Sequence, residues 1–287
     1  MLESLKKSGL FLIFIAAFFF GIMVLLVKLA AKTIPSHEIL LFRSIFGATF
    51  LFVLVRTKVA SLKFINKPLL FFRGIVGAAA VMCLYYALSR IPLGIATLLN
   101  CTYPIFATVF AVLFIKEKVA WDGILALSVS MLGMYLVLNP KTVALDAGYV
   151  FALVSGVLAG AAILSIKKLR ETESSWAVFY SFTVACIIYS LPLTIINFRI
   201  PDAAEFIVLL MMAMVSTFAQ LIMSYAYKYA KASEGSVVIL ATPIFAAIFG
   251  FLFFAETFSV LEISGAFLVL GGGAYLVVKE RIHRTTM

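Results

Sequence analysis

A long apolar stretch with a proline in its middle occurs twice in this chain, and this repeat constrains the fold more strongly than any other feature. The first copy covers residues 98–118 and the second covers residues 239–256, so that Pro104 corresponds to Pro243 at an offset of 139 residues. Between positions 86 and 117, ten residues are identical to their partners at this offset: Tyr86, Ala87, Pro104, Ile105, Phe106, Ala107, Phe110, Leu113, Phe114 and Glu117. The chain is therefore a duplicated one, made of two copies of one unit.

The two prolines interrupt the helices that contain them. Pro104 has no N–H group, so it cannot bond the carbonyl of Asn100 four residues earlier. Hydrocarbon cannot replace that bond, and such a break is tolerated at membrane depth where protein or a wet cavity covers it. We interpret Pro104 and Pro243 as hinge positions that free backbone carbonyls for a solute. Kinks that serve packing alone are the alternative.

The composition indicates a membrane protein. Of the 287 residues, 64% are hydrophobic and 13% are charged, and the mean hydropathy is +1.15. A soluble core cannot absorb that much apolar sequence, and repeated runs of about eighteen or more apolar residues predict membrane-spanning helices. We predict an all-α integral membrane protein with ten transmembrane helices, at residues 9–31, 38–55, 69–88, 95–115, 119–138, 147–166, 176–197, 205–229, 236–255 and 259–278.

The same offset relates the first helix of each half, because Gly21 corresponds to Gly160. We therefore predict two repeats of five helices each, residues 1–140 and 141–287. An odd number of spans in each repeat places the two repeats upside down relative to each other. Inverted repeats of this kind are the architecture of many secondary transporters.

Lysine and arginine define the expected orientation. The net charge of +10 suggests nucleic acid at first sight, but in a membrane protein such a charge reports cytoplasmic loops, and we expect no nucleic-acid partner. Threading ten spans puts seventeen of the 23 basic residues, Arg73 among them, on the side of both termini, and four on the other side. We therefore expect a multi-pass protein of the cytoplasmic (inner) membrane, surrounded by the lipid bilayer, with both termini in the cytoplasm.

The stretch Tyr85–Val119 resembles the repeat signature of the drug/metabolite transporter superfamily, specifically of its EamA family. The resemblance lies in a Tyr-Ala-Leu sequence before a short turn, in residues 92–96 (PLGIA), in the helix proline and in the closing Glu117. Upstream, residues 21–28 and the pair Phe42-Arg43 are similar to the first and second helices of that family. The second copy departs from the pattern, because it has no arginine at the position that corresponds to Arg43.

This resemblance implies a ten-helix solute carrier. We expect a secondary transporter that moves a small organic metabolite, amino-acid-like or otherwise amphiphilic and including anionic solutes, by alternating access, and that works as an exporter. A membrane receptor that transports nothing or an intramembrane enzyme is the alternative. The sequence holds no visible nucleophile–base set and no metal-ligand cluster, so we expect no enzyme, no metal and no cofactor. A monomer and a homodimer both stay open.

Polar residues beside the first proline are candidates for binding the solute. Asn100 and Tyr103 flank Pro104, whereas Ile239 and Thr242 occupy the equivalent positions of the second copy. The fourth span thus carries the polar groups of the pair, which favours a solute-facing side there. A buried asparagine can equally bond across helices for about 1 kcal/mol.

Further candidates lie on three other spans. Gln220 and Ser224 share one face of the eighth span, four residues apart, and are expected to line the cavity. Lys28 and Arg43 are charges inside spans, and Arg43 lies about 9 Å from the start of its span by helical rise. A charge there costs of order 2.5–3.5 kcal/mol, so we expect both to attract an anionic group of the solute, with Glu38 or the solute carboxylate as the partner of Arg43. Snorkelling of Lys28 and a structural Arg43 are the alternatives.

Glu117 and Glu256 each end one span and precede the next. We interpret them as favourable charges at the N-terminus of the helix that follows. A site for a coupling proton is the alternative interpretation.

Overall fold

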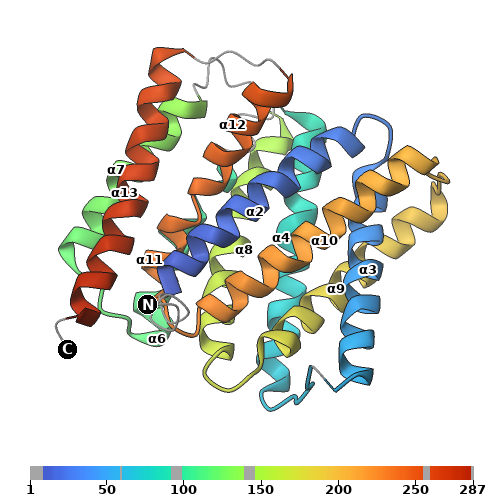
Figure 1. Cartoon of the computed structure of the whole chain (residues 1–287), viewed down its shortest axis with the longest axis horizontal. Helices are drawn as coiled ribbons and strands as arrows, with labels where there is room; N and C mark the ends of the chain where they lie inside the picture. The colour runs from blue at the N-terminus through green and yellow to red at the C-terminus, as the bar shows by residue number, and fades with distance from the viewer. Residues whose placement is uncertain (1–8, 59, 92–98, 139–145, 255–258, 286–287) are drawn as a thin grey trace.

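The computed structural model describes residues 9–58, 60–91, 99–138, 146–254 and 259–285, and every regular element in these ranges is a helix (Figure 1). The helices are α2 (Gly9–Ala30), α3 (Ser36–Arg56), α4 (Lys67–Arg90), α6 (Tyr103–Ile115), α7 (Trp121–Leu138), α8 (Ala147–Leu169), α9 (Ser175–Ile196), α10 (Ala203–Ala226), α11 (Ala232–Val238), α12 (Ala241–Phe254) and α13 (Val260–Thr285). Six of the described helices, namely α2, α3, α4, α8, α9 and α10, are long and apolar enough to cross a membrane. The predicted all-α membrane fold is therefore confirmed.

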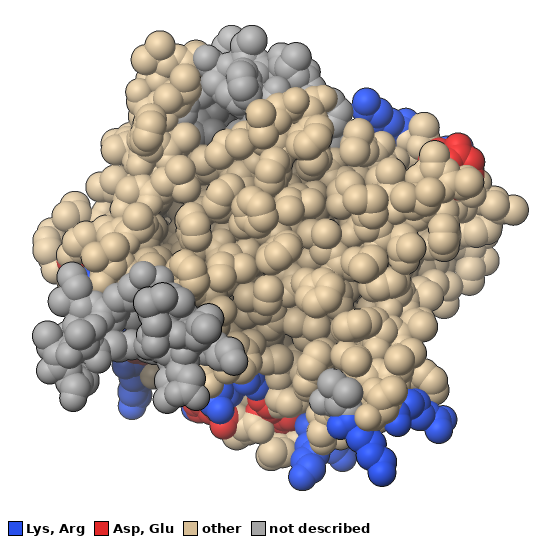
Figure 2. Space-filling model, in the orientation of Figure 1, with Lys and Arg blue, Asp and Glu red and all other residues tan. Residues whose placement is uncertain are grey.

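The outer surface of the bundle is apolar at mid-height. Large apolar side chains point outward there, including Leu132 (56% exposed), Ile188 (65%) and Met211 (50%). Figure 2 shows a broad uncharged band with charged side chains gathered at its edges. Helices that expose such residues in this pattern are surrounded by hydrocarbon rather than by water.

Two of the predicted spans are interrupted helices, and the interruptions lie just before the prolines. In the fourth span the chain turns at Cys101–Thr102 before α6 begins, and in the ninth it turns at Ile239–Leu240 between α11 and α12. Pro104 and Pro243 therefore lie near the start of the second piece of each span. Proline fits that position because an N–H in the first turn of a helix has no intrahelical partner.

Polar side chains begin several of the long helices. Asn66 accepts a hydrogen bond from Leu69 N (3.2 Å) at the start of α4, and Asp146 accepts one from Gly148 N (2.6 Å) at the start of α8. A reciprocal pair of bonds between Asp202 and Glu205, both 2.8 Å, begins α10. These caps satisfy N–H groups that the helix leaves without a partner and fix where each span starts.

The two halves of the chain are inverted and make equivalent contacts. A Cβ atom added at Gly9 would lie 2.6 Å from Ala230 N, and one added at Gly148 would lie 2.8 Å from a side-chain carbon of Ile91. Gly148 is Gly9 shifted by 139 residues, and Ala230 is Ile91 shifted by 139 residues. The repeat in the sequence is thus a repeat in the packing, and α2 and α8 run in opposite directions (Figure 1).

The most extensive helix contacts join the first half to the second. Helix α4 packs on α8 and α9, α2 packs on α10 and α12, α3 packs on α9, and α7 packs on α13. A large apolar cluster towards the end of the bundle where α2 begins includes Leu10 of α2, Ile166 of α8, Ala226 of α10 and Val238 of α11. The two halves therefore share one core, and the exact division at residues 140 and 141 stays a prediction.

The charge distribution agrees with the sequence count except at Arg73. Blue side chains gather along the lower edge of the molecule, where α3 ends and α4 begins (Figure 2). Arg73 was expected among them, but its side chain is 3% exposed and lies inside the bundle. It is six residues from the start of α4 at Lys67, about 9 Å by helical rise, which is too deep for the surface.

Candidate solute-binding site

The first helix break carries a polar side chain that reaches another helix. The side-chain amide of Asn100 donates a hydrogen bond to the Ser155 hydroxyl on α8. The carbonyl of Leu99 accepts bonds from the hydroxyl (2.6 Å) and the N–H (3.3 Å) of Thr102, which closes the turn. The break is thus held both by its own turn and by a contact between the two halves.

Two glycines of α8 allow this break to approach closely. A Cβ added at Gly156 would lie 3.0 Å from the carbonyl oxygens of Leu99 and Asn100, and one added at Gly160 would lie 2.8 Å from Ala107 N. Backbone atoms cannot move aside as a flexible side chain can, so any larger residue would push α6 and α8 apart. The small residues of α8 therefore hold the broken span at its depth in the bundle.

The second break is less polar, as the sequence predicts. Ile239 and Leu240 are buried, and Thr242 N bonds the Ile239 carbonyl at 3.0 Å. Leu240 shares one buried apolar cluster with Cys101 of the first break, and Tyr103 packs against that cluster. The structure therefore brings the two breaks together inside the bundle, with Pro104 buried and Pro243 half-buried.

A buried polar face lies along the second half of α10. Gln220 (5% exposed), Ser224 (0%) and Tyr227 (0%) follow one another at steps of four and three residues, which places them on one side of the helix. Among the described residues, Gln220 Nε2, Ser224 Oγ and Tyr227 Oη have no hydrogen-bond partner. Tyr227 also belongs to the large apolar cluster against which Tyr103 of the first break packs. Sequence reasoning missed Tyr227, although its spacing from Ser224 was the available signal.

Arg43 contacts α4 and α9, whereas Asn100 bonds α8. Its guanidinium carbon is 5.6 Å from the centre of the Phe182 ring on α9, and the Tyr85 hydroxyl of α4 lies beside it. Arg73, from the opposite end of α4, also lies over the Phe182 ring, at 4.9 Å. Sequence reasoning missed Arg73, although the depth argument applied to Arg43 would have found it.

The expectation that Glu38 pairs with Arg43 is wrong, and those for Lys28 and Glu256 stay predictions. Glu38 does not serve Arg43; its Oε2 accepts a bond from the backbone N–H of Arg199 (3.4 Å), and the carboxylate is fully buried at the start of α3. Glu38 and Arg43 are five residues apart, which is more than one helical turn, so the two side chains leave the helix in different directions. The side chain of Lys28 and all of Glu256 lie outside the described residues.

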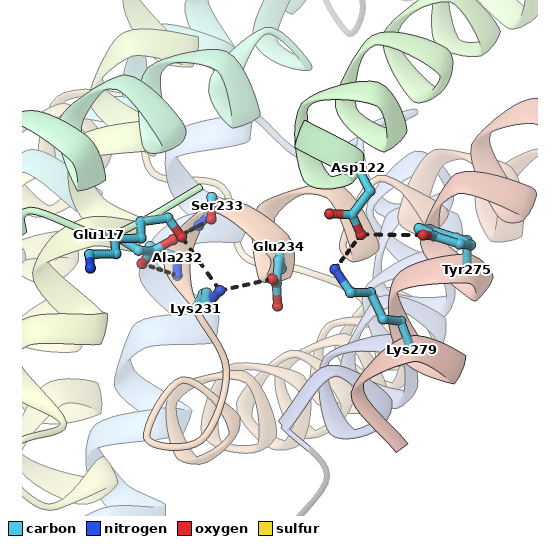
Figure 3. A network of polar contacts seen from close by, with 9 residues as sticks. Glu117, Asp122, Lys231, Ala232, Ser233, Glu234, Tyr275 and Lys279 are labelled. Carbon is cyan, nitrogen blue, oxygen red and sulfur yellow. Dashed lines mark hydrogen bonds and ion pairs between the residues drawn. The ribbon is translucent and has the colours of Figure 1, made fainter. Parts of the chain in front are cut away.

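Glu117 contacts the second half of the chain rather than the helix that follows it. Its carboxylate accepts bonds from Ala232 N (3.0 Å), Ser233 N (3.2 Å) and the Ser233 hydroxyl at the start of α11 (Figure 3). The interpretation that it stabilises the start of α7 is therefore wrong, because the tertiary fold offers it a different helix end. Beside it, Lys279 of α13 pairs with Asp122 of α7.

The chain is similar to known membrane transporters over nearly all of its length. The model of a family described as the EamA-like transporter family matches residues 7–139 and again residues 146–278. The pseudopaline exporter CntI of Pseudomonas aeruginosa is 30% identical over 272 residues, which cover 94% of this chain and 96% of the exporter. An S-adenosylmethionine uptake transporter of Rickettsia prowazekii is 20% identical over 256 residues, covering 88% and 87%. One solved crystal structure, 15% identical, shares the fold with a TM-score of 0.83 over 95% of this chain and 99% of its own.

Proposed function

Since the chain belongs to the EamA-like transporter family, we propose that it is a secondary carrier that exports a small organic metabolite across the cytoplasmic membrane by alternating access. Membrane transport is what the family membership supports directly. Export is favoured because a relative that is 30% identical over most of the chain is named an exporter. The expected orientation has both termini in the cytoplasm, in agreement with the excess of basic residues on their side.

The buried polar face of α10 is the observation that carries the proposed binding site. A polar atom that is buried without a partner costs about 1–3 kcal/mol, so each such atom calls for an explanation. Gln220 Nε2, Ser224 Oγ and Tyr227 Oη are three such atoms on one helix face. A solute or water that reaches this face from the two helix breaks supplies the missing partners.

The proposed solute binds near Pro104 and Pro243, between the broken spans and the helices that pack on them. Asn100 and Tyr103 supply a polar edge and an aromatic face on one side, and Gln220 supplies an amide on the other. Most of the remaining surroundings are apolar side chains of the two clusters that contain Ile239 and Leu240. Such a site favours an amphiphilic metabolite over a bare ion or a free sugar.

Thermal unfolding of the purified protein tests this proposal first. Amino acids, nucleosides and vitamins are screened for a rise in melting temperature, since a ligand that binds the folded state alone stabilises it. The best compound is then followed in proteoliposomes by counterflow, and in right-side-out and inside-out vesicles for direction. Uptake into inside-out vesicles supports export, whereas protein-dependent movement only into right-side-out vesicles contradicts it.

Two substitutions connect the activity to α10. Gln220→Leu and Ser224→Ala should each lower counterflow about tenfold without lowering the melting temperature, because each removes an unpaired buried polar group. Ser128→Ala is the matched control, since that hydroxyl is on an exposed part of α7 and bonds Ile124 O at 3.0 Å. Normal counterflow in Gln220→Leu and Ser224→Ala would remove this face from the solute path.

A further inference from the structure

Arg73 is a buried cation whose guanidinium is not fully paired. Its side chain is 3% exposed, and its Nε and Nη1 atoms have no hydrogen-bond partner among the described residues. Taking a charged group out of water costs several kcal/mol in real proteins unless other groups compensate it. A charge in this position needs a compensating partner at some stage of the protein's working cycle.

Arg43 places a second positive charge beside Arg73, and this increases the need for a compensating anion. The guanidinium carbons of Arg43 and Arg73 lie 5.6 Å and 4.9 Å from the centre of the same Phe182 ring. A cation over an aromatic ring gains about 0.5–2 kcal/mol, which is less than the cost of burying it. The ring therefore orients the two arginines but does not neutralise them.

No acidic side chain completes this cluster within the part of the chain that the structure describes. The ion pairs found there join Lys168 to Glu171, Arg199 to Glu205, Lys231 to Glu234 and Lys279 to Asp122. Glu38, the acidic residue closest to Arg43 along the chain, is bonded to the backbone of Arg199 instead. The two arginines thus face a neutral environment of Phe182, Tyr85 and Cys186.

The backbone of α4 is shaped to hold the guanidinium of Arg73. A Cβ atom added at Gly77 would collide with Arg73 Nη1 and would lie 3.1 Å from Cδ2 of Phe182. Gly77 is one turn beyond Arg73, so the absence of its side chain leaves the space that the guanidinium occupies. The cation therefore lies against the helix inside the bundle and not at the surface.

We propose that Arg43, Arg73 and Phe182 form a binding site for a carboxylate of the transported solute. The planar fork of a guanidinium matches a carboxylate with two parallel hydrogen bonds, and two such forks suit one carboxylate held between them or a solute with two. The half-buried side chains of Met82 and Tyr85, which pack against the cluster that contains Phe182, offer an apolar surface to the body of the same molecule. The solute class is therefore an organic acid with an apolar or unsaturated part, which deepens the proposed function and rests on it.

The depth of the site suits a carrier. Arg43 is seven residues from the start of α3 and Arg73 is six residues from the start of α4, and these two helices begin at opposite ends of the bundle. The two side chains therefore reach the same ring from the two sides of the membrane, from backbone positions about 10.5 Å and about 9 Å inside the ends of their helices by helical rise. An anion held there can be passed between the arginines as access changes from one side to the other.

Pairs of compounds in which amides replace one or two carboxylates test the site. The purified protein is melted in L-glutamate and L-glutamine, in succinate and succinamide, and in citrate, at matched ionic strength. We expect at least one carboxylate to raise the melting temperature while its amide does not. Arg73→Met keeps the approximate length of the side chain and removes its charge. It should raise the carboxylate concentration needed for half of this effect about tenfold or more, because the charge-assisted hydrogen bonds are lost.

Arg56→Met is the matched control. Arg56 also lies over a phenylalanine ring, that of Phe52 at 5.0 Å, but on the exposed end of α3. This variant should respond to the carboxylates as the wild type does. Two further variants repeat the test. Arg43→Gln removes the other guanidinium, and Gly77→Val fills the space that Arg73 occupies. The result therefore does not depend on the folding of a single variant.

The ligand-free proteins give a second readout. If Arg73 awaits an anion, Arg73→Met should melt at or above the temperature of the wild type, because it removes an uncompensated buried charge. Three results would each overturn the site. In the first, ligand-free Arg73→Met melts clearly below the wild type. In the second, none of the carboxylates stabilises the wild type, and in the third the carboxylates stabilise the variants as much as the wild type. Counterflow of an uncharged solute that survives Arg73→Met would leave the proposed carrier function standing and remove this inference alone.

Discussion

The carboxylate of Glu117 accepts hydrogen bonds from both the backbone N–H and the hydroxyl of Ser233. Glu117 follows α6, the second piece of the first broken span, and Ser233 lies in the first turn of α11, the first piece of the second broken span. The side chain therefore serves as the N-cap of a helix that lies 115 residues further along the chain at Ala232. The two broken spans are joined to each other at the end of the bundle where α2 begins (Figure 3).

Removing this cap should lower stability. Glu117→Ala takes away the acceptor for two N–H groups and one hydroxyl, and the loss of a cap costs about 1 kcal/mol. Glu117→Gln keeps one acceptor oxygen and should show a smaller loss. The melting temperatures of the purified variants provide the measurement.

Glu171→Ala is the control for this prediction, because Glu171 forms an exposed pair with Lys168 (2.6 Å) and exposed pairs contribute little. If Glu171→Ala and Glu117→Ala lowered the melting temperature equally, the contact with α11 would have no special role.

Asn100 and Ser155 should act as one unit. Asn100→Leu and Ser155→Ala each break the bond between the first helix break and α8, and such a bond inside a membrane is worth about 1 kcal/mol. The double variant should therefore lose less stability than the sum of the two single losses. Additive losses in melting temperature would mean that the two residues contribute through separate contacts.

Gly160 should tolerate no side chain. A methyl group there would meet Ala107 N and Phe106 Cβ at 2.8 Å, and overpacking of this kind costs about 1–3 kcal/mol. Gly160→Ala should lower both the melting temperature and the yield of folded protein in the membrane.

Gly271→Ala is the matched control, since a Cβ at Gly271 of α13 meets nothing within 4 Å. It should leave stability unchanged or raise it slightly, because alanine is the better helix former by about 1 kcal/mol. Equal losses in the two variants would show that helix propensity, rather than the approach of α6, sets the effect.

Topology is tested by fusions of a compartment-sensitive reporter. A reporter after Met287 and one within residues 139–146 should give opposite signals, with the terminal one cytoplasmic, because five spans lie between the two positions. The same signal from both would contradict the inverted arrangement in the membrane. An external signal from the reporter after Met287 would reverse the expected orientation.

The helices and their internal repeat could be predicted from the sequence. The length of an apolar run and the offset between its two copies can both be read from the order of the residues. The span predicted at residues 147–166 is α8 (Ala147–Leu169), and the offset of 139 residues reappears in the contacts of Gly9 and Gly148. The helix breaks at Pro104 and Pro243 were also predictable. The exact positions of the turns, two to four residues before each proline, were not predictable, because each turn is fixed by bonds such as that between Thr102 and Leu99.

The partners of the polar residues could not be predicted, since they come from helices far apart in the sequence. Asn100 meets Ser155, Glu117 meets α11, and Arg43 shares Phe182 with Arg73. Each of these contacts joins the first half of the chain to the second half or depends on a helix from it. A pattern within one span shows which residues are out of place in hydrocarbon, but only the tertiary fold shows what they meet.

The packing of α2 on α10, α3 on α9, α4 on α8 and α7 on α13 has a consequence for biosynthesis. The ribosome delivers the first five spans before the last five, and at about 5–20 residues per second the interval is about seven to thirty seconds. During this interval the newly inserted spans face lipid with the surfaces that later pack on their partners, including the side of α4 that carries Arg73. The nascent first half is therefore a client for membrane chaperones and proteases, and its lifetime depends on how soon the second half arrives.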